Sequence, residues 1–203
     1  MLVLYTAATN NGVRANIALA ESGLPYEVRK LDLASGEQRK PDYLDINPAG
    51  RIPALVDPAG PAGEVRLSQS GAIMIYAAGK APGLWPAQDA NKIAALQWLM
   101  FACTDVALTS SMLWQATQTM PEKSAANIEY SEKRLLRWLG EAQEQLNKSE
   151  FLAGELSVAD YALFPVVHSN RVLVQKAGME RLMQWHAVLH ARPGVQRGLR
   201  ESG

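Results

Sequence analysis

Two neighbouring segments carry residue types that could bind a short acidic peptide. In the run NPAGRIPALV, residues 47–56, Pro53 directly precedes an apolar stretch that is typical of a buried strand. A chain held extended beside this proline leaves the N–H and C=O of Ile52 free to pair with a peptide-like ligand. After a second short strand, residues 65–67, Ser70 stands where a helix N-cap is expected. Its hydroxyl and the free N–H groups that follow could bind a carboxylate.

A third segment, TNNG directly before Val13, could lower the pKa of a thiol. A free thiol has a pKa of about 8.5, so little of it is ionised at neutral pH. Hydroxyl or amide donors from Thr9, Asn10 or Asn11, together with the positive end of a helix, would stabilise the thiolate. Alternatively, Thr9 or Asn11 simply caps that helix. The two roles are compatible, because each needs only one donor.

The elements that hold these residues follow a recognisable order. An apolar run at residues 2–5 predicts one strand, and residues 26–31 predict a second, with Tyr26 and Val28 on one face. Val13, Ile17 and Ala20 recur between the two strands at helical spacing. Two further strands around the Pro-Gly turn at 58–61 and a helix after Ser70 complete a βαβ–ββα order. This is the thioredoxin-like arrangement, with one parallel and one antiparallel connection.

The remainder of the chain is helical in pattern. The run GKAPGLWP, residues 79–86, predicts a linker. We therefore expect an α/β + α fold: a thioredoxin-like domain at 1–79, a linker at 80–88 and an all-helical domain at 89–203. Two apolar stripes at helical spacing support the last part; they consist of Ile93, Leu96, Leu99 and Met100, and of Ile128, Leu135, Leu139, Ala142 and Leu146.

Near the end, Ser157 and Asp160 predict a capping box that opens a helix over 158–174. Asp160 is therefore expected to be structural, although it is an acid in an apolar run. Arg192, Pro193 and Gly194 are expected to stop the last long helix.

The first two segments resemble the glutathione S-transferase family. There, an N-P-x-G-x-[IV]-P-x-L segment carries a cis-proline whose neighbour pairs with the cysteinyl backbone of glutathione, and a Glu/Gln–Ser pair holds the γ-glutamyl carboxylate. The resemblance implies that Gln38 and Arg51 flank the glycyl end and the backbone of the ligand. Gln69 stands in place of the usual Glu, which weakens a charge contact with the ligand amino group but leaves a hydrogen bond possible. The matching residues are Asn47, Pro48, Gly50, Ile52, Pro53, Leu55, Gln69 and Ser70.

The subclass follows from the loop after the first strand. Thr9, Asn11 and Gly12 match a Thr-x-Asn-Gly run that looks like the bacterial nu class and its fungal prion-related cousins, in which Thr and Asn contact the glutathione sulfur. Variants with a catalytic Cys are excluded, because no Cys lies near residue 10. Tyr5 could be the tyrosine that other classes place at this strand. Residues 105–118 depart from the nu pattern.

The resemblance implies a cytoplasmic detoxification enzyme and a homodimer. Glutathione would be the cosubstrate, and its thiolate would attack a small apolar electrophile or a disulfide. The leading alternative is a non-catalytic scaffold or interaction module, since this fold also serves as a binding platform. A thioredoxin-type oxidoreductase is a weaker alternative, because the Cys-x-x-Cys pair is missing.

Composition agrees with these expectations. Twenty basic and 20 acidic residues give a net charge of zero, which argues against nucleic-acid or membrane partners. A single cysteine excludes an intrachain disulfide and argues either for a reducing compartment or for indifference to the redox state. The N-terminus is typical of a strand and not of a signal peptide, and we expect no membrane span.

Other reactive side chains have simpler interpretations. Cys103 lies in a helical, apolar run, where a structural thiol is expected rather than a nucleophile. His186 and His190 have a spacing that can clasp a metal, but no third ligand is near, so no metal site is predicted. Trp98, Met112 and Trp114 could line an acceptor pocket or belong to the core; core is the expectation for Trp98, and Trp114 stays open.

Overall fold

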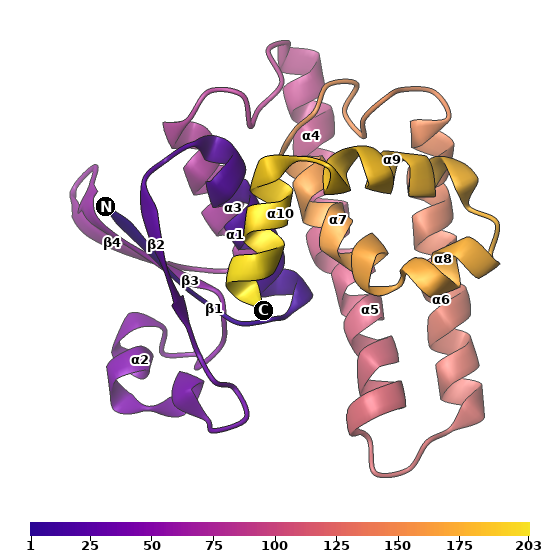
Figure 1. Ribbon diagram of the computed structural model, residues 1–203, viewed down its shortest axis with the longest axis horizontal. Helices are drawn as coiled ribbons and strands as arrows, with labels where there is room; N and C mark the ends of the chain where they lie inside the picture. Colours follow the sequence, from indigo (N-terminus) through magenta and orange to yellow (C-terminus); the bar gives the residue numbers. More distant parts are fainter. The chain divides into compact units, whose positions relative to one another are not determined.

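The computed structural model describes residues 1–203 and divides into two compact units (Figure 1). The first unit comprises residues 1–85 and 190–203, and the second comprises residues 86–189. This division differs from the expected one at the C-terminus, because the last helix groups with the first unit.

The first unit is built on a four-stranded sheet in the order β2-β1-β3-β4. β1 is parallel to β2, whereas β3 is antiparallel to both β1 and β4. The fold is the predicted thioredoxin-like arrangement. The strands are β1 (Leu2–Thr6), β2 (Tyr26–Lys30), β3 (Ala54–Gly60) and β4 (Gly63–Ser68).

Helices cover this sheet unequally. Figure 1 shows α1 (Asn10–Ser22), α3 (Ser70–Lys80) and α10 (Pro193–Ser202) together, with α2 (Pro41–Ile46) apart from them. Side chains of β1 alternate accordingly: those of Leu2, Leu4 and Thr6 are buried, and those of Val3 and Tyr5 are half-buried. Tyr5 packs against Tyr43 of α2, with ring centroids 5.8 Å apart, so α2 covers the second face. A 3-10 turn, η1 (Glu37–Arg39), precedes α2.

Buried polar contacts hold α10 against α1. The amide of Asn16 donates to Ser202 Oγ at 2.9 Å and accepts from the Tyr26 hydroxyl at 2.8 Å. Arg192 forms a 2.6 Å ion pair with the buried carboxylate of Glu21. Pro193 therefore does more than end the preceding helix, because it occupies the first turn of α10, where its missing N–H costs nothing.

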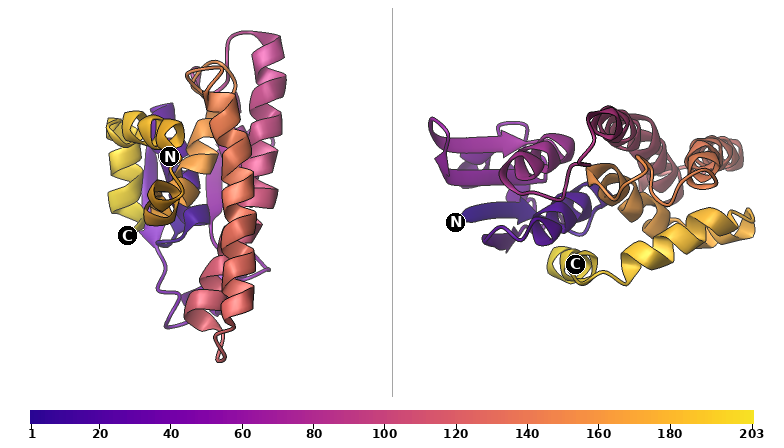
Figure 2. Two further views of the ribbon diagram at one scale, coloured as in Figure 1. Left: turned by 90° about the vertical axis from the view of Figure 1, so that its right-hand side faces the viewer. Right: turned by 90° about the horizontal axis from the view of Figure 1, so that it is seen from above.

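The second unit is all helical. Its first long run joins α4, a π-helical stretch η2, α5 and a second π-helical stretch η3, and α6 runs alongside it (Figure 2). The predicted all-helical character is confirmed. The bounds are α4 (Asp89–Phe101), η2 (Ala102–Val106), α5 (Ala107–Trp114), η3 (Gln115–Thr119), α6 (Ala125–Leu146), α7 (Val158–Ser169), α8 (Arg171–Lys176) and α9 (Glu180–His190).

One predicted apolar stripe is core and the other is mostly surface. In α6, Leu135, Leu139, Ala142 and Leu146 are buried, and Ile128 is half-buried. Of the predicted stripe in α4, only Leu99 is buried. Ile93 is 71% exposed, and Leu96 and Met100 are also exposed. Helical spacing identifies an apolar face, but it does not say what covers that face.

The capping box at α7 is confirmed. The Asp160 carboxylate accepts from the Ser157 N–H at 3.0 Å, and Ser157 Oγ accepts from the Ala159 N–H at 3.3 Å. α7 is shorter than the predicted 158–174, because the chain leaves helical geometry at Asn170 before α8 begins.

By length and composition alone, the helical run Asp89–Thr119 could cross a membrane. The expectation that no window approaches a span was therefore too strong. One third (33%) of the most apolar window is buried within the protein.

Candidate functional site

Thr9 occupies the turn between β1 and α1. Its backbone is extended, and its Oγ1 accepts a hydrogen bond from the Gly12 N–H at 3.1 Å, so Thr9 is the N-cap of α1. The Thr9 N–H donates a hydrogen bond to the Ala7 carbonyl at 2.7 Å, which stabilises this turn. Capping uses the oxygen of Thr9 as an acceptor and leaves its O–H proton able to donate. Asn11, in the first turn of α1, is exposed.

The cis-proline segment has the predicted backbone. The Ile52–Pro53 peptide bond is cis, and Pro53 is buried at the entrance to β3. Ile52 is half-buried, and neither its N–H nor its C=O makes a hydrogen bond within the protein. An extended peptide group without a partner can pair with the backbone of a ligand.

Gln69 and Ser70 lie in the turn from β4 into α3. Gln69, and not Ser70 as predicted, is the N-cap, and it is the one non-glycine residue with positive φ, at 73°. Ser70 is the first helical residue and is 8% exposed. The free N–H groups of the first turn of α3 still form a site that favours an anion.

Strand register brings these three segments together. Tyr5 of β1 pairs with Ala54 of β3, which pairs with Ser68 of β4. The loop after β1, the cis-proline before β3 and the turn after β4 therefore meet at one end of the sheet. Neighbouring strands lie about 4.8 Å apart, so their ends lie within about 10 Å. That span suits an extended tripeptide.

Gln38 and Arg51 border the same region. Gln38 belongs to η1, and its carbonyl oxygen lies 3.0 Å from where a Cβ on Gly50 would be. Its side-chain Oε1 is buried and accepts no hydrogen bond from the protein. The side chain of Arg51 is exposed. A donor on a ligand could satisfy the Gln38 oxygen.

Tyr5 lies on the other side of β1 from Thr6. Its hydroxyl accepts a hydrogen bond from Arg29 at 3.0 Å, and its ring packs on Tyr43. These contacts place the Tyr5 ring on the α2 face of the sheet, whereas Thr9 caps α1, which packs on the opposite face.

The other reactive side chains have structural partners. Both oxygens of Asp160 accept hydrogen bonds, from groups that include the Trp185 indole at 2.9 Å. Burial raises the pKa of Asp160 to about 6, and the hydrogen bonds oppose that rise. Cys103 is half-buried in η2. Nε2 of His186 lies 3.0 Å from Nδ1 of His168, and Nδ1 of His190 lies 3.1 Å from the amide nitrogen of Gln196. No cluster of three potential metal-binding side chains occurs.

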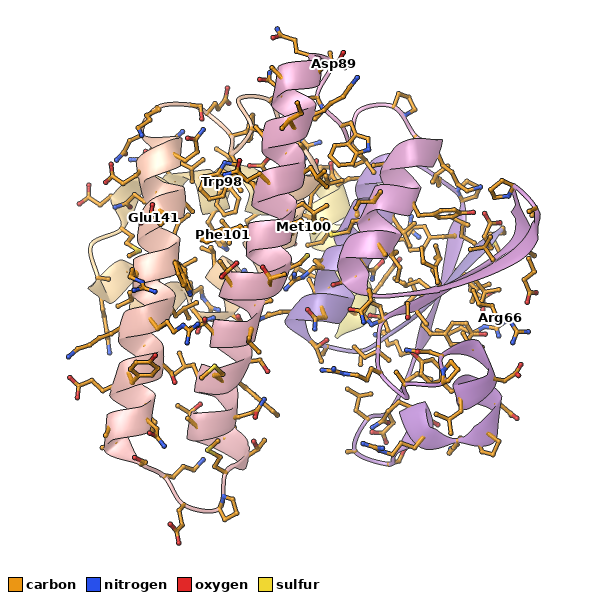
Figure 3. All side chains as sticks on the ribbon, turned by 180° about the vertical axis from the view of Figure 1, so that it is seen from behind. Arg66, Asp89, Trp98, Met100, Phe101 and Glu141 are labelled. Carbon is orange, nitrogen blue, oxygen red and sulfur yellow. The ribbon has the colours of Figure 1, made fainter.

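The three side chains considered for an acceptor pocket, Trp98, Met112 and Trp114, differ in burial. Trp98 packs edge-on against Phe101, which packs edge-on against Trp138 of α6, so these rings join α4 to α6 (Figure 3). Met112 is half-buried. Trp114 is 58% exposed and is therefore not a core residue.

Comparison with known proteins agrees with this geometry. The family model "Glutathione S-transferase, N-terminal domain" matches residues 1–79, and "Glutathione S-transferase, C-terminal domain" matches residues 106–200. The chain belongs to the glutathione S-transferase family. A curated relative in this family, the disulfide-bond oxidoreductase YfcG of Escherichia coli strain K12, is 30% identical over 98% of this chain and 94% of its own length.

Solved structures of the family are also similar. A glutathione transferase from Pseudomonas putida, with one glutathione disulfide bound per subunit, matches with a TM-score of 0.92 and 30% identity, over 100% of this chain and 92% of that one. A family member from Pseudomonas fluorescens Pf-5, with two glutathione bound, matches with a TM-score of 0.90 and 31% identity, over 98% and 92%.

Proposed function

We propose that this protein is a glutathione-dependent enzyme that reduces small disulfides and, more slowly, conjugates small apolar electrophiles. The observation that carries this proposal is the register Tyr5–Ala54–Ser68, which brings the loop after β1, the unpaired Ile52 peptide group and the first turn of α3 to one end of the sheet. The name of the E. coli relative and the glutathione and glutathione disulfide bound to the two Pseudomonas proteins support it.

Each site residue has a proposed role. The Thr9 hydroxyl or the Asn11 amide donates to the glutathione sulfur and lowers its pKa, aided by the positive end of α1. The Ile52 backbone, set by Pro53, pairs with the cysteinyl part of the ligand. Ser70 and the first turn of α3 bind the γ-glutamyl carboxylate, and Gln69 hydrogen-bonds its amino group. Gln38 and Arg51 contact the glycyl end and the backbone.

The chemistry uses no covalent bond to the protein. The bound glutathione thiolate attacks one sulfur of a small disulfide, and the other sulfur leaves as a thiolate that takes up a proton. A second glutathione thiolate then attacks the glutathione sulfur of this mixed disulfide, which forms glutathione disulfide and releases the second thiol. The protein activates a nucleophile that the cosubstrate supplies. The run Thr9-Asn10-Asn11-Gly12 is our reason for placing the protein nearest to the nu class.

A homodimer in the cytoplasm is part of the same proposal. The α4–α5 run exposes a row of large apolar side chains, which an isologous contact between two copies would cover. Light scattering should give a mass near twice the 22.1 kDa of one chain; a mass near one chain at all working concentrations would contradict the dimer. The exposed residues are Ile93, Leu96, Met100 and Leu108.

The test has two stages that separate an enzyme from a scaffold. Retention on immobilised glutathione, with elution by free glutathione, reports an intact binding site. Glutathione-dependent reduction of hydroxyethyl disulfide, followed through formation of glutathione disulfide, then reports catalysis. A non-catalytic scaffold without the site would pass through the column and show no turnover.

A further inference from the structure

The carbonyl oxygen of Arg51 is held by two buried side chains. The Tyr43 hydroxyl donates to it at 2.7 Å, and the Asn47 amide nitrogen donates at 2.5 Å. Tyr43 is 4% exposed and Asn47 is 5% exposed, whereas the Arg51 side chain lies in solvent. Two side chains that are withdrawn from water thus converge on one backbone oxygen of an otherwise exposed residue, and together they occupy both of its lone pairs.

These two hydrogen bonds fix the direction of the neighbouring Ile52 N–H. The C=O of Arg51 and the N–H of Ile52 belong to one planar peptide unit and point in opposite directions. Because Tyr43 and Asn47 hold the oxygen toward the protein interior, the Ile52 N–H must point away from it. That N–H has no partner within the protein. The residue after Ile52 is the cis-proline that leads into β3, at the end of the sheet where the other loops meet.

α2 provides a rigid base for both donors. Tyr43 and Asn47 are four residues apart and lie on one side of the helix end, where the Asn47 N–H bonds to the Tyr43 carbonyl at 2.9 Å. The other end of the Asn47 side chain accepts from the Ala49 N–H at 3.2 Å, so both ends of the amide are engaged. Burial raises the pKa of Tyr43 to about 12, which keeps its hydroxyl protonated and able to donate.

We propose that Tyr43 and Asn47 are positioning residues, which orient the Arg51–Ile52 peptide so that the Ile52 N–H pairs with the cysteinyl carbonyl of glutathione. This inference rests on the proposed function. Neither side chain needs to touch the ligand. Their effect is on affinity for glutathione, because a freely rotating peptide would have to be ordered each time the ligand binds.

Two near-isosteric variants test the idea. Tyr43→Phe removes one donor and keeps the ring that packs on Tyr5. Asn47→Asp keeps the acceptor for Ala49 and replaces the donor by an oxygen. We expect KM for glutathione to rise about threefold to tenfold in each and more in the double variant, with kcat changed less than twofold.

The matched control is Tyr76→Phe. The Tyr76 hydroxyl also donates to a buried acceptor of the same unit, the Asp57 carboxylate, at 2.6 Å. This hydrogen bond does not involve the Arg51–Ile52 peptide. This variant should lower stability without raising KM for glutathione.

Hydrogen exchange of the Ile52 amide, followed by NMR on the full chain with and without glutathione, gives a second readout. In the wild type, glutathione should slow exchange at Ile52, and in Tyr43→Phe the slowing should be largely lost. Equal KM values and equal protection in the wild type and Tyr43→Phe, with only stability reduced, would overturn the positioning role. Failure of the wild type to bind glutathione would instead refute the proposed function. If Asn47→Asp does not fold, Tyr43→Phe decides alone.

Discussion

Gly12 lies so close to Ala7 that no side chain fits between them. A Cβ on Gly12 would be 2.3 Å from the Ala7 carbonyl oxygen and 2.4 Å from Thr6 Oγ1. The same Ala7 oxygen accepts the N–H of Thr9, and the Gly12 N–H donates to Thr9 Oγ1. The end of β1, the Thr9 turn and the start of α1 are therefore built around one close approach that only glycine permits.

Gly12→Ala should consequently damage the proposed thiol-activating loop. The new methyl group must displace either the Ala7 carbonyl or the start of α1, at a cost of about 1–3 kcal/mol in unfolding free energy. We expect the pKa of glutathione bound to this variant, read from thiolate absorbance against pH, to move back toward that of a free thiol. The control is Gly140→Ala in α6, where a Cβ meets nothing within 4 Å. That change should stabilise the protein by up to about 1 kcal/mol. If the pKa of the bound thiol is unchanged in Gly12→Ala, the loop does not activate the thiol.

The contacts of Asp57 predict that the unfolding free energy of the protein falls in acid. Hydrogen bonds from Lys80 and Tyr76 lower the pKa of this carboxyl group to about 2. Because the pKa in the folded state lies below the unfolded value of about 3.9, the ionised group stabilises the fold above pH 4. That contribution, about 2 kcal/mol, disappears as the pH falls from about 4 to 2.

Denaturant unfolding of the wild type and Asp57→Asn at pH 6 and pH 2.5 measures this effect. The difference in unfolding free energy between the two proteins should shrink markedly at the lower pH. A difference that stays constant would mean that the Asp57 carboxylate is not stabilised as the contacts indicate.

Ser70→Ala should weaken glutathione binding by about 1–3 kcal/mol, the usual cost of removing a hydrogen-bond partner from a charged group. Ser70 is the first residue of α3, so its hydroxyl lies beside the free N–H groups of that turn. Titration calorimetry compares the two affinities. Ser131→Ala is the control, because Ser131 is similarly buried but its hydroxyl donates to the Asn127 carbonyl within α6. Equal affinity in Ser70→Ala would remove Ser70 from the site.

Local signals explain why much of the site could be predicted. The cis-proline segment, the Ser157–Asp160 box and the Thr9 cap each depend on residues within a few positions of one another, so the sequence contains the whole signal. Gln69 is different. Its positive φ is imposed by the turn that joins β4 to α3, and a glutamine carries no signal for that geometry.

Contacts between residues far apart in the sequence could not be predicted from local patterns. Asn16 meets Ser202 across 186 positions, and no periodicity could have assigned α10 to the first unit. No local pattern could have assigned a role to Tyr43, because its hydrogen bond to Arg51 depends on where the loop after α2 returns. The exposure of Ile93 and Met100 likewise depends on what packs beside α4.

Cys103 should be dispensable for glutathione turnover. It is half-buried within the π-helical stretch η2 of the second unit, and it is the only cysteine of the chain. Cys103→Ala should keep most of the wild-type rate. A loss of more than about tenfold, which corresponds to about 1.4 kcal/mol of barrier, at unchanged thermal stability would show that the thiol takes part in the chemistry.

The loop that contains Thr9 and Asn11 should favour disulfide reduction over aryl conjugation. The loop has no thiol of its own, so it can stabilise a glutathione thiolate but cannot resolve a mixed disulfide. Disulfide reduction needs only a donor for the attacking sulfur and a second glutathione. Conjugation of a chlorinated aromatic also needs a pocket for a flat ring, and the largest exposed aromatic side chain on α4 and α5 is Trp114. We therefore expect reduction of small disulfides to be faster than aryl conjugation.

Substitution tests the assignment within this loop. Thr9→Ser keeps both the cap and the hydroxyl donor and should retain most of the activity. Thr9→Ala loses both, and Asn11→Ala loses an exposed amide that does not cap the helix. At least one of the two alanine variants should lower the rate about tenfold or more. A tenfold loss corresponds to an increase of about 1.4 kcal/mol in the activation free energy. Thr9→Asp separates the two roles of Thr9, because aspartate still caps α1 but offers no proton to a thiolate. If Thr9→Asp is as active as the wild type and Asn11→Ala is unaffected, the sulfur must be activated by a backbone N–H of α1 or by Tyr5.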